Sequence, residues 1–162
     1  MNNKKILIVS DTHGRRQHLE MALEKVGKVD MLFHLGDVEG DEDYIEEIAG
    51  CPAYIVAGNN DWFSNLPGEI VVTIGKHRIF MSHGHSYYVS RTRERLKQRA
   101  REKRADIAMY GHTHRPDIDL ADDVKVINPG SLSHPRQVGR EYTYILMEID
   151  ENEEVNFSLC TL

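Results

Sequence analysis

The chain has 162 residues, enough for one domain with a substantial core, because folded chains of this size bury roughly two-thirds of the surface that they expose when unfolded. Its 20 basic and 26 acidic residues give a formal net charge of −6, which argues against a protein that coats nucleic acid or an anionic membrane. Its two cysteines, Cys51 and Cys160, predict neither a disulfide framework nor a thiolate metal cluster, and a reducing cytoplasm is the expected location.

The first half of the chain alternates short apolar segments with helical patterns. Residues 6–9 are too short for a signal-peptide core or a membrane span and are predicted to form a buried strand. Helices are predicted over 15–26 and 41–49, and further strands over 31–35 and 53–57. Each strand ends in a polar turn. This alternation favours an α/β fold, whose ligands collect outside the carboxyl ends of the strands.

The second half of the chain is richer in strands. Residues 69–74 and 78–82 are predicted strands joined by a hairpin-like connection, so the sheet edges here are expected to be antiparallel. A strongly charged helix is predicted over 90–104. Further strands are predicted over 107–110, 124–127, 142–149 and 155–159. The sequence contains no internal repeat or linker, and residues 1–162 are interpreted as one domain.

Residue types that bind metals occur at several predicted strand ends. Asp11 and His13 are separated by one residue, so an anionic oxygen and a neutral imidazole can reach the same ion. Asp37 follows a glycine at the next strand end, and its two carboxylate oxygens can bridge two ions. Asn59 also follows a glycine and offers an amide oxygen without adding negative charge. His83 stands at a later strand end.

Two further histidines, His112 and His114, repeat the one-residue spacing. We expect their segment to be extended, so that both imidazoles face the same side. A pair of divalent ions bound by two carboxylates keeps a net charge of about +2, which suits a phosphate, and such a pair also supplies a nucleophile. The seven residues therefore predict a dinuclear site for phosphate-ester hydrolysis.

Each motif also has an ordinary structural interpretation when it is taken alone. Asp11 can be a helix N-cap, glycine before aspartate or asparagine is common in turns, and a single histidine at a strand end is usually solvated. The site is predicted because five motifs fall in order at strand ends and together provide a complete set of donors. The histidines without such support are interpreted as structural or surface residues: His18, His34, His77 and His134.

The ordered motifs resemble those of the calcineurin-like metallophosphoesterase family: Asp11-Thr12-His13, Gly36-Asp37, Gly58-Asn59, His83 and Gly111-His112-Thr113-His114. Asn128-Pro129-Gly130-Ser131, followed by Pro135-Arg136, is similar to a segment of its small single-domain bacterial and archaeal phosphodiesterases. The resemblance implies a two-sheet β-sandwich flanked by helices, with metals at the strand ends. It also implies that a hydroxide held between two ions attacks a phosphate diester in line.

The resemblance further assigns each ligand to an ion. Asp11, His13, Asp37 and His114 would bind one ion, and Asp37, Asn59, His83 and His112 the other, so Asp37 would bridge the two and count as catalytic. Mn²⁺ is the expected ion, with Ni²⁺, Co²⁺, Fe²⁺ and Zn²⁺ as alternatives, because ligand type does not choose among them. The expected partner is a small phosphate ester. No membrane partner is expected, and a homo-oligomer is left open.

One position departs from many relatives, which carry a histidine directly after the motif asparagine to serve the leaving group. Here that residue is Asn60, whose neutral amide cannot donate a proton as an acid. His85 or a metal-bound water would then supply the proton, and diesters or activated esters with leaving groups of low pKa would be preferred. Asn60 and Arg136 are the candidate substrate-binding residues, and the alternative for Arg136 is an ordinary surface arginine.

Two rival functions differ in what they require of the sequence. A non-catalytic scaffold on the same fold, like some trafficking-complex relatives, would be expected to have lost metal ligands, whereas all seven are present here. A phosphoprotein phosphatase or nucleotide pyrophosphohydrolase usually needs insertions, for which 162 residues leave little room.

Two surface features are interpreted as structural. Residues 91–104 include eight basic and two acidic side chains, which could attract nucleic acid. Leu96 and Ala100, four residues apart, instead favour a buried seam beneath a solvated basic face. Trp62 and Phe63 follow the Asn59 motif and could wall the site or join a subunit contact, but at least one of them is expected to pack in the core.

Overall fold

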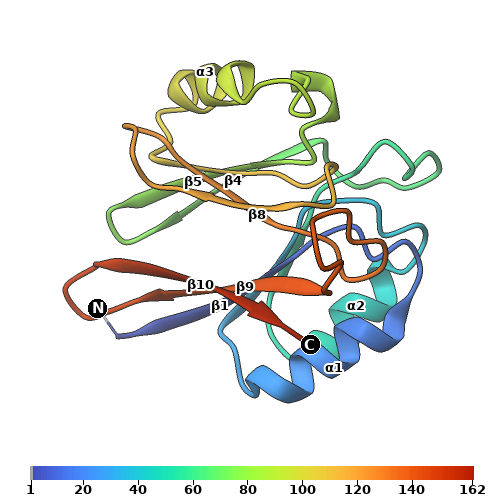
Figure 1. The fold of residues 1–162 in the computed structure, drawn as a ribbon. Coiled ribbons are helices and arrows are strands. Elements are labelled where there is room, and N and C mark those ends of the chain that lie inside the picture. The colour runs from blue at the N-terminus through green and yellow to red at the C-terminus, as the bar shows by residue number, and fades with distance from the viewer. Residues whose placement is uncertain (1) are drawn as a thin grey trace.

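Two five-stranded β-sheets stack face to face in the computed structural model, which describes residues 2–162 (Figure 1). The strands of the first sheet are β1 (Lys4–Val9), β2 (Met31–His34), β3 (Ala53–Ile55), β9 (Thr143–Ile149) and β10 (Val155–Thr161). Their order is β10-β9-β1-β2-β3. β1, β2 and β3 are parallel, so their carboxyl ends meet at one edge, and β9 is antiparallel to both of its neighbours.

The second sheet comprises β4 (Glu69–Ile74), β5 (His77–Ser82), β6 (Ile107–Met109), β7 (Pro116–Asp119) and β8 (Lys125–Pro129). Its order is β4-β5-β6-β8-β7. The edges are antiparallel, as predicted, whereas β5, β6 and β8 are parallel. The sequence analysis missed β7, a short edge strand that begins with proline, which is tolerated there because it breaks no inner ladder.

Helices cover the outer faces of the sheets and give a four-layer molecule (Figure 1). α1 (Arg16–Val26) and α2 (Glu42–Ala49) pack on the first sheet, and α3 (Glu94–Glu102) packs on the second. The predicted class, an α/β sandwich of two sheets flanked by helices, is confirmed. Within residues 2–162, the helices are too short or too polar to cross a membrane.

β1 shows why its sequence is apolar throughout. Ile6 and Ile8 belong to the core between the two sheets, whereas Leu7 and Val9 belong to the core beneath α1 and α2. All four side chains are fully buried. Alternate residues of a strand point to opposite faces, so a strand covered on both sides needs a continuous apolar run.

α3 is shorter than predicted and begins at Glu94, because a short 3₁₀ helix over His85–Tyr87 and a turn precede it. Leu96 and Ala100 are fully buried, as the predicted seam requires. Much of the positive charge of this segment is neutralised by carboxylates of the same chain. The ion pairs join Arg93 to Asp117, Lys97 to Asp122, Arg99 to Glu69 and Arg101 to Asp123. This pairing favours the solvated face over a nucleic-acid track.

Candidate metal centre

The loops after β1 and β2 run side by side beyond the ends of the strands. The Asp11 N–H donates to the Gly36 carbonyl oxygen at 3.0 Å, and the His13 N–H donates to the Asp37 carbonyl oxygen at 2.9 Å. β1 and β2 are parallel, so both loops leave the sheet at its carboxyl edge. This pairing brings three of the predicted ligands, Asp11, His13 and Asp37, into one place.

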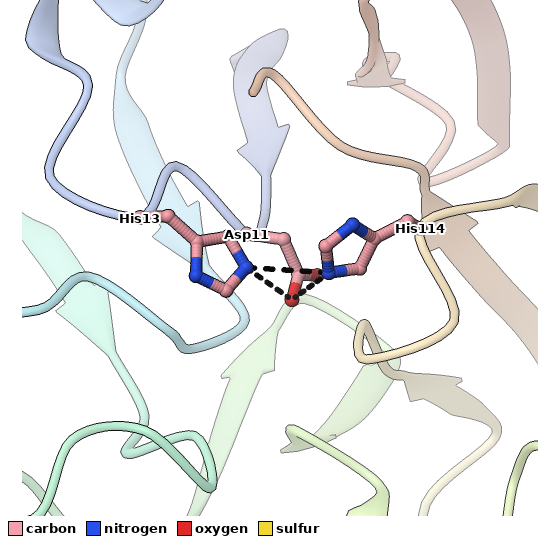
Figure 2. A group of neighbouring side chains, drawn as sticks. All are labelled: Asp11, His13 and His114. Atoms are coloured by element: carbon pink, nitrogen blue, oxygen red, sulfur yellow. Dashed lines mark hydrogen bonds and ion pairs between the residues drawn. The ribbon is translucent and has the colours of Figure 1, made fainter. Parts of the chain in front are cut away.

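Asp11 lies at the middle of the site and is fully buried. Its Oδ2 atom accepts hydrogen bonds from the Ser10 hydroxyl at 2.6 Å and from the His112 N–H at 3.0 Å. Its Oδ1 atom lies 3.7 Å from His13 Nε2 and 3.2 Å from His114 Nε2. Figure 2 shows the two imidazoles flanking this oxygen. One oxygen of the carboxylate is therefore saturated, and the other faces imidazoles.

Hydrogen bonds on the far side of two imidazoles fix which nitrogen faces the site. His83 Nδ1 donates to the Leu35 carbonyl oxygen at 2.6 Å, and His114 Nδ1 donates to the His134 carbonyl oxygen at 2.6 Å. In a neutral ring Nε2 is then an acceptor. His83 Nε2 lies 3.8 Å from Asp11 Oδ1, so two hydrogen-bond acceptors face each other without a hydrogen between them. The arrangement therefore needs a cation, either a proton or a metal ion.

The Asp37 carboxylate lies between two imidazoles. Its Oδ2 atom is 3.4 Å from His83 Nε2 and 3.7 Å from His13 Nε2. Asn60 holds this carboxylate with two hydrogen bonds, from its backbone N–H to Oδ1 at 2.9 Å and from its side-chain amide to Oδ2 at 3.0 Å. The orientation of Asp37 is thus fixed by the residue that follows the motif asparagine.

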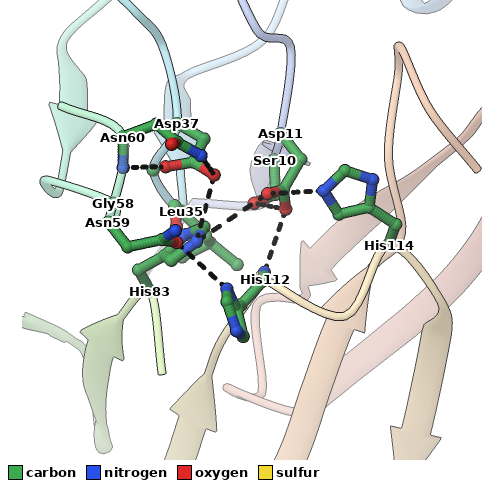
Figure 3. Close-up of polar contacts among 12 residues, drawn as sticks. Ser10, Asp11, Leu35, Asp37, Gly58, Asn59, Asn60, His83, His112 and His114 are labelled. Carbon is green, nitrogen blue, oxygen red and sulfur yellow. Dashed lines mark hydrogen bonds and ion pairs between the residues drawn. The ribbon is translucent and has the colours of Figure 1, made fainter. Parts of the chain in front are cut away.

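Asn59 and His112 lie on the His83 side of the centre. His112 Nδ1 is 3.0 Å from Asn59 Oδ1, and the ring centroids of His112 and His83 are 5.1 Å apart. Figure 3 shows these residues and Asp37 converging from different loops. The structure brings all seven predicted ligands together. Which ion each of them binds stays a prediction.

The pKa shifts at the centre follow from two carboxylates surrounded by imidazoles. Burial opposes ionisation of Asp11, but hydrogen bonds with neighbouring imidazoles outweigh it and hold the pKa of Asp11 well below its usual range. Burial likewise opposes ionisation of Asp37, but His83 and Asn60 lower its pKa to about 2. Burial alone would lower the pKa of His13, yet its carboxylate neighbours raise it to about 9. Both carboxylates therefore remain charged and attract a cation.

The cluster fits divalent metal ions. Asp11 Oδ1 and His83 Nε2 are buried and have no hydrogen-bond partner within residues 2–162. Ligand atoms of Asp11, His13 and His114 lie within 4.8 Å of one another, and so do those of Asp11, Asp37 and His83. Carboxylate oxygen and imidazole nitrogen are donors that first-row divalent ions accept. Asp11 belongs to both groups, and Asp37 Oδ2 also lies between His83 and His13, so both carboxylates occupy the space between the two groups.

Left-handed backbone conformations are concentrated in the predicted ligands. The φ angles are 54° at Asp11, 49° at His13, 59° at Asp37, 70° at His112 and 59° at His114. Such a conformation costs an ordinary residue roughly 1–2 kcal/mol and is typical of functional sites. The prediction that residues 112–114 are extended is therefore wrong. His114 faces His13, and His112 faces the opposite side of the centre.

Two glycines are required by close packing at the centre. A Cβ atom added at Gly58 would lie 2.1 Å from Asp37 Oδ1. At Gly111 it would lie 2.1 Å from Ser10 Oγ and 2.7 Å from Asp11 Oδ2. The glycine before Asn59 and the glycine before His112 therefore allow a backbone to approach a carboxylate, a reason that the sequence analysis did not foresee.

Asp61, which the sequence analysis did not single out, joins two ligand loops. Its Oδ2 atom accepts hydrogen bonds from the N–H groups of Asp37 at 2.8 Å, Gly58 at 2.7 Å and Val38 at 3.3 Å, and its Oδ1 atom accepts one from Glu39 at 2.7 Å. Asp61 is therefore a positioning residue. Nothing in its local sequence distinguishes it from an aspartate in an ordinary turn.

The segment 128–131, singled out only by resemblance, also supports the centre. The hydroxyls of Ser131 and Ser133 donate to the Asp11 carbonyl oxygen at 2.8 and 2.6 Å. The Asn128 side-chain amide donates to the Gly111 carbonyl oxygen at 3.2 Å. These bonds attach the loop after β8 to two of the loops that carry ligands.

His34 is a buried structural residue, in line with its interpretation from the sequence. Its Nδ1 atom accepts a hydrogen bond from the Gly36 N–H at 3.1 Å, so Nε2 of the neutral ring donates to the Thr12 hydroxyl at 2.9 Å. Burial lowers the pKa of His34 to about 4. The ring therefore stays neutral and connects the loops after β1 and β2.

The other predicted site residues lie around the centre. His85 is exposed, and its ring centroid is 5.5 Å from that of His83 and 6.1 Å from that of His112. Burial, followed by the positive charge of His83, lowers the pKa of His85. The Arg136 N–H donates to the His114 carbonyl oxygen at 3.0 Å, and its side chain is exposed. The roles predicted for His85, Arg136 and Asn60 stay predictions.

Trp62 and Phe63 do not pack in the core, so that prediction is wrong. Their exposed fractions are 80% and 103%. Together with Asn60 and Glu39 they line a cavity of about 430 Å³ beside the centre. These two aromatic side chains therefore belong to the surface beside the centre and not to the core.

A two-sheet sandwich with carboxylate, amide and imidazole donors at its strand ends defines a class of metal-dependent phosphoesterases. Residues 5–152 match the calcineurin-like phosphoesterase superfamily domain, and the chain belongs to this family. It is 33% identical over 144 residues to the phosphodiesterase MJ0936 of Methanocaldococcus jannaschii, covering 78% of this chain and 82% of that protein.

Solved structures share the fold. A predicted phosphoesterase from Streptococcus pneumoniae TIGR4 has a TM-score of 0.81 and 31% identity, covering 100% of this chain and 99% of that chain. Vps29 from Entamoeba histolytica has a TM-score of 0.77 and 22% identity, covering 98% of this chain and 99% of that chain. The second likeness concerns the fold alone.

Proposed function

We propose that the protein is a phosphodiesterase that uses two divalent metal ions, Mn²⁺ foremost, held by the seven predicted ligands. The observation that carries this proposal is the convergence of acceptor atoms, because Asp11 Oδ1 and His83 Nε2 are buried without a partner in the described part of the chain. Membership of the phosphoesterase family supports hydrolysis of phosphate esters. The similarity to a named phosphodiesterase supports a diester substrate.

When bound, the ions supply positive charge around the phosphate and a water of lowered pKa as nucleophile. The chain's own residues hold the donors. We propose that Asp37 is the shared ligand, since Asn60 fixes both of its oxygens and Oδ2 lies 3.4 Å from His83 Nε2 and 3.7 Å from His13 Nε2. With two carboxylates among seven ligands, the loaded site keeps a charge of about +2 for the phosphate.

The proton donor for the leaving group is the part of the reaction for which the chain offers the fewest residues. Asn60 uses its amide on the Asp37 carboxylate and cannot act as an acid. His85 is the nearby candidate donor, beside His83 and His112. We therefore expect rates to rise steeply as the pKa of the leaving group falls across a series of aryl phosphate diesters. A slope near zero would contradict this expectation.

Hydrolysis of bis-p-nitrophenyl phosphate by the metal-stripped protein, with and without added Mn²⁺, tests the proposal. We expect turnover only with metal and a loss of at least about a hundredfold in Asp37→Ala. The matched control is Asp43→Ala, which removes an exposed carboxylate on α2. Activity without metal, or equal activity in the two variants, would refute the proposal.

The alternative function is a non-catalytic scaffold on the same fold. The structure of Vps29 shows that this fold also occurs in a protein that is not named a phosphoesterase. The complete set of ligands argues against it here. We also propose a cytoplasmic location, which the low cysteine content of the sequence favours. A protein that binds Mn²⁺ but hydrolyses neither diesters nor monoesters would favour the scaffold.

A further inference from the structure

A cavity rich in arginine adjoins the metal centre. It has a volume of about 630 Å³ and is lined by Arg115, Arg136, Arg140, His134 and Tyr142, with Ser133 and Pro135. Its lining contains no carboxylate among the described residues. We call it the arginine cavity. Three arginines in the lining of one cavity, with no carboxylate beside them, favour a positive potential that attracts anions.

The arginine cavity shares a wall with the metal centre. The His134 carbonyl oxygen accepts the hydrogen bond from His114 Nδ1 at 2.6 Å, and the His134 ring centroid lies 5.4 Å from that of His13. The Arg136 N–H donates to the His114 carbonyl oxygen at 3.0 Å. The backbone that carries the cavity is therefore attached to a predicted metal ligand, so an anion in the cavity would lie next to the centre.

The arginines of the cavity differ from three of the arginines in and just before α3. Arg93, Arg99 and Arg101 each have a carboxylate partner within 3.4 Å. Within residues 2–162, by contrast, Arg115 and Arg136 have no carboxylate within 4.0 Å, and the same holds for the third arginine of the cavity. Their positive charge is therefore available to a ligand.

A second cavity, of about 500 Å³, also includes Arg115 and Arg136 but contains a carboxylate. That carboxylate belongs to Asp117, which pairs with Arg93 at 2.7 Å and accepts a hydrogen bond from the Tyr110 hydroxyl at 2.7 Å. An anion placed there would meet a fixed negative charge. The arginine cavity is consequently the better anion site of the two.

We propose that the arginine cavity binds a second phosphate group of the substrate while the diester phosphate lies at the metal centre. This inference rests on the proposed function and narrows the substrate class to diesters that carry a second phosphate group near the scissile one. Guanidinium groups suit this role because their paired N–H donors match two phosphate oxygens. Diesters with two uncharged arms would use the metals alone.

Two substrates that differ by one phosphate test the inference. Thymidine 5′-(p-nitrophenyl phosphate) and its 3′-phosphorylated form release the same p-nitrophenolate. With the metal-loaded protein we expect a KM at least about tenfold lower for the 3′-phosphorylated form, as a charge-assisted contact provides. The preference should disappear in Arg115→Gln/Arg136→Gln. It should persist in the control Arg95→Gln/Arg104→Gln, which removes the same charge elsewhere on the surface.

Binding separates this inference from the proposed catalysis. Thymidine 3′-monophosphate should bind the metal-stripped protein at least about tenfold more tightly than thymidine, by isothermal titration calorimetry, because only the arginine cavity can hold a phosphate without the metals. The double variant at Arg115 and Arg136 should bind the two equally. Equal binding by the wild-type protein, or a preference that the double variant keeps, would overturn the arginine cavity as a phosphate site. Absence of hydrolysis with this binding preference intact would instead refute only the proposed function.

Discussion

Asp61→Asn tests whether the centre depends on the aspartate that joins two ligand loops. The carboxylate accepts four backbone N–H groups, three at Oδ2 and one, from Glu39, at Oδ1. An amide has one acceptor oxygen, so at least one N–H group loses its partner and the others lose a charged acceptor. Hydrogen bonds to charged groups contribute about 1.5–3 kcal/mol and neutral ones about 0.5–1.5 kcal/mol. We therefore expect the free energy of unfolding to fall by about 2–4 kcal/mol.

Urea unfolding of the metal-stripped protein measures this loss, and calorimetric titration with Mn²⁺ measures its effect on the ligands. We expect the affinity for metal to fall about 10–100-fold, as for other residues that orient ligands. Asp150→Asn is the matched control, because Asp150 Oδ1 accepts the N–H groups of Asn152 and Glu154 at 2.8 and 2.9 Å, and an amide oxygen can keep both. Equal stability and equal metal affinity in the two variants would refute the reasoning.

Two further predictions concern stability near the ligand loops. The pKa of His34 falls from 6.5 to about 4 in the folded protein, so between these values the unfolded chain binds a proton that the folded chain does not. The contribution of the neutral His34 to the free energy of unfolding is therefore complete above pH 6.5 and is lost as the pH falls towards 4. Between pH 7 and 5, urea unfolding should therefore show a loss of stability that is about 2 kcal/mol larger in the wild-type protein than in His34→Asn, and parallel pH profiles would contradict it. Gly111→Ala should lower the free energy of unfolding by about 1–3 kcal/mol, because its Cβ would meet Ser10 Oγ at 2.1 Å. The control Gly68→Ala, whose Cβ would meet nothing within 4 Å, should leave the thermal midpoint nearly unchanged. Equal thermal midpoints of the two variants would contradict the packing argument.

The fold was predictable from the sequence where apolar runs and turns were clear. The segment containing Ile6–Val9 is apolar because both faces of β1 are covered, and the parallel strands follow from the helices between them. β7 was missed because Pro116–Asp119 is half-exposed and polar at a sheet edge, so no apolar pattern marks it. Interpretation of residues 1–162 as a single domain stays a prediction.

The ligand set was predictable because the residue types and their spacing along the chain are typical of metal ligands. Its geometry was not, since His112 and His114 are left-handed rather than extended, and a sequence pattern does not record φ angles. Asp61 and the two serines that support Asp11 act through backbone groups from distant loops, and such contacts carry no local signature. For Trp62, the aromatic side chain favoured burial in the sequence analysis, but the residue is exposed in the structure.

Metal titration of the stripped protein, followed by hydrolysis of bis-p-nitrophenyl phosphate, tests the central claim most directly. Two sites per chain predict that activity rises with Mn²⁺ and saturates at two equivalents. His83→Ala removes a buried ligand of one predicted site, so it should retain about one equivalent and lose activity. Saturation at one equivalent in the wild-type protein, or full activity of His83→Ala, would contradict the dinuclear account.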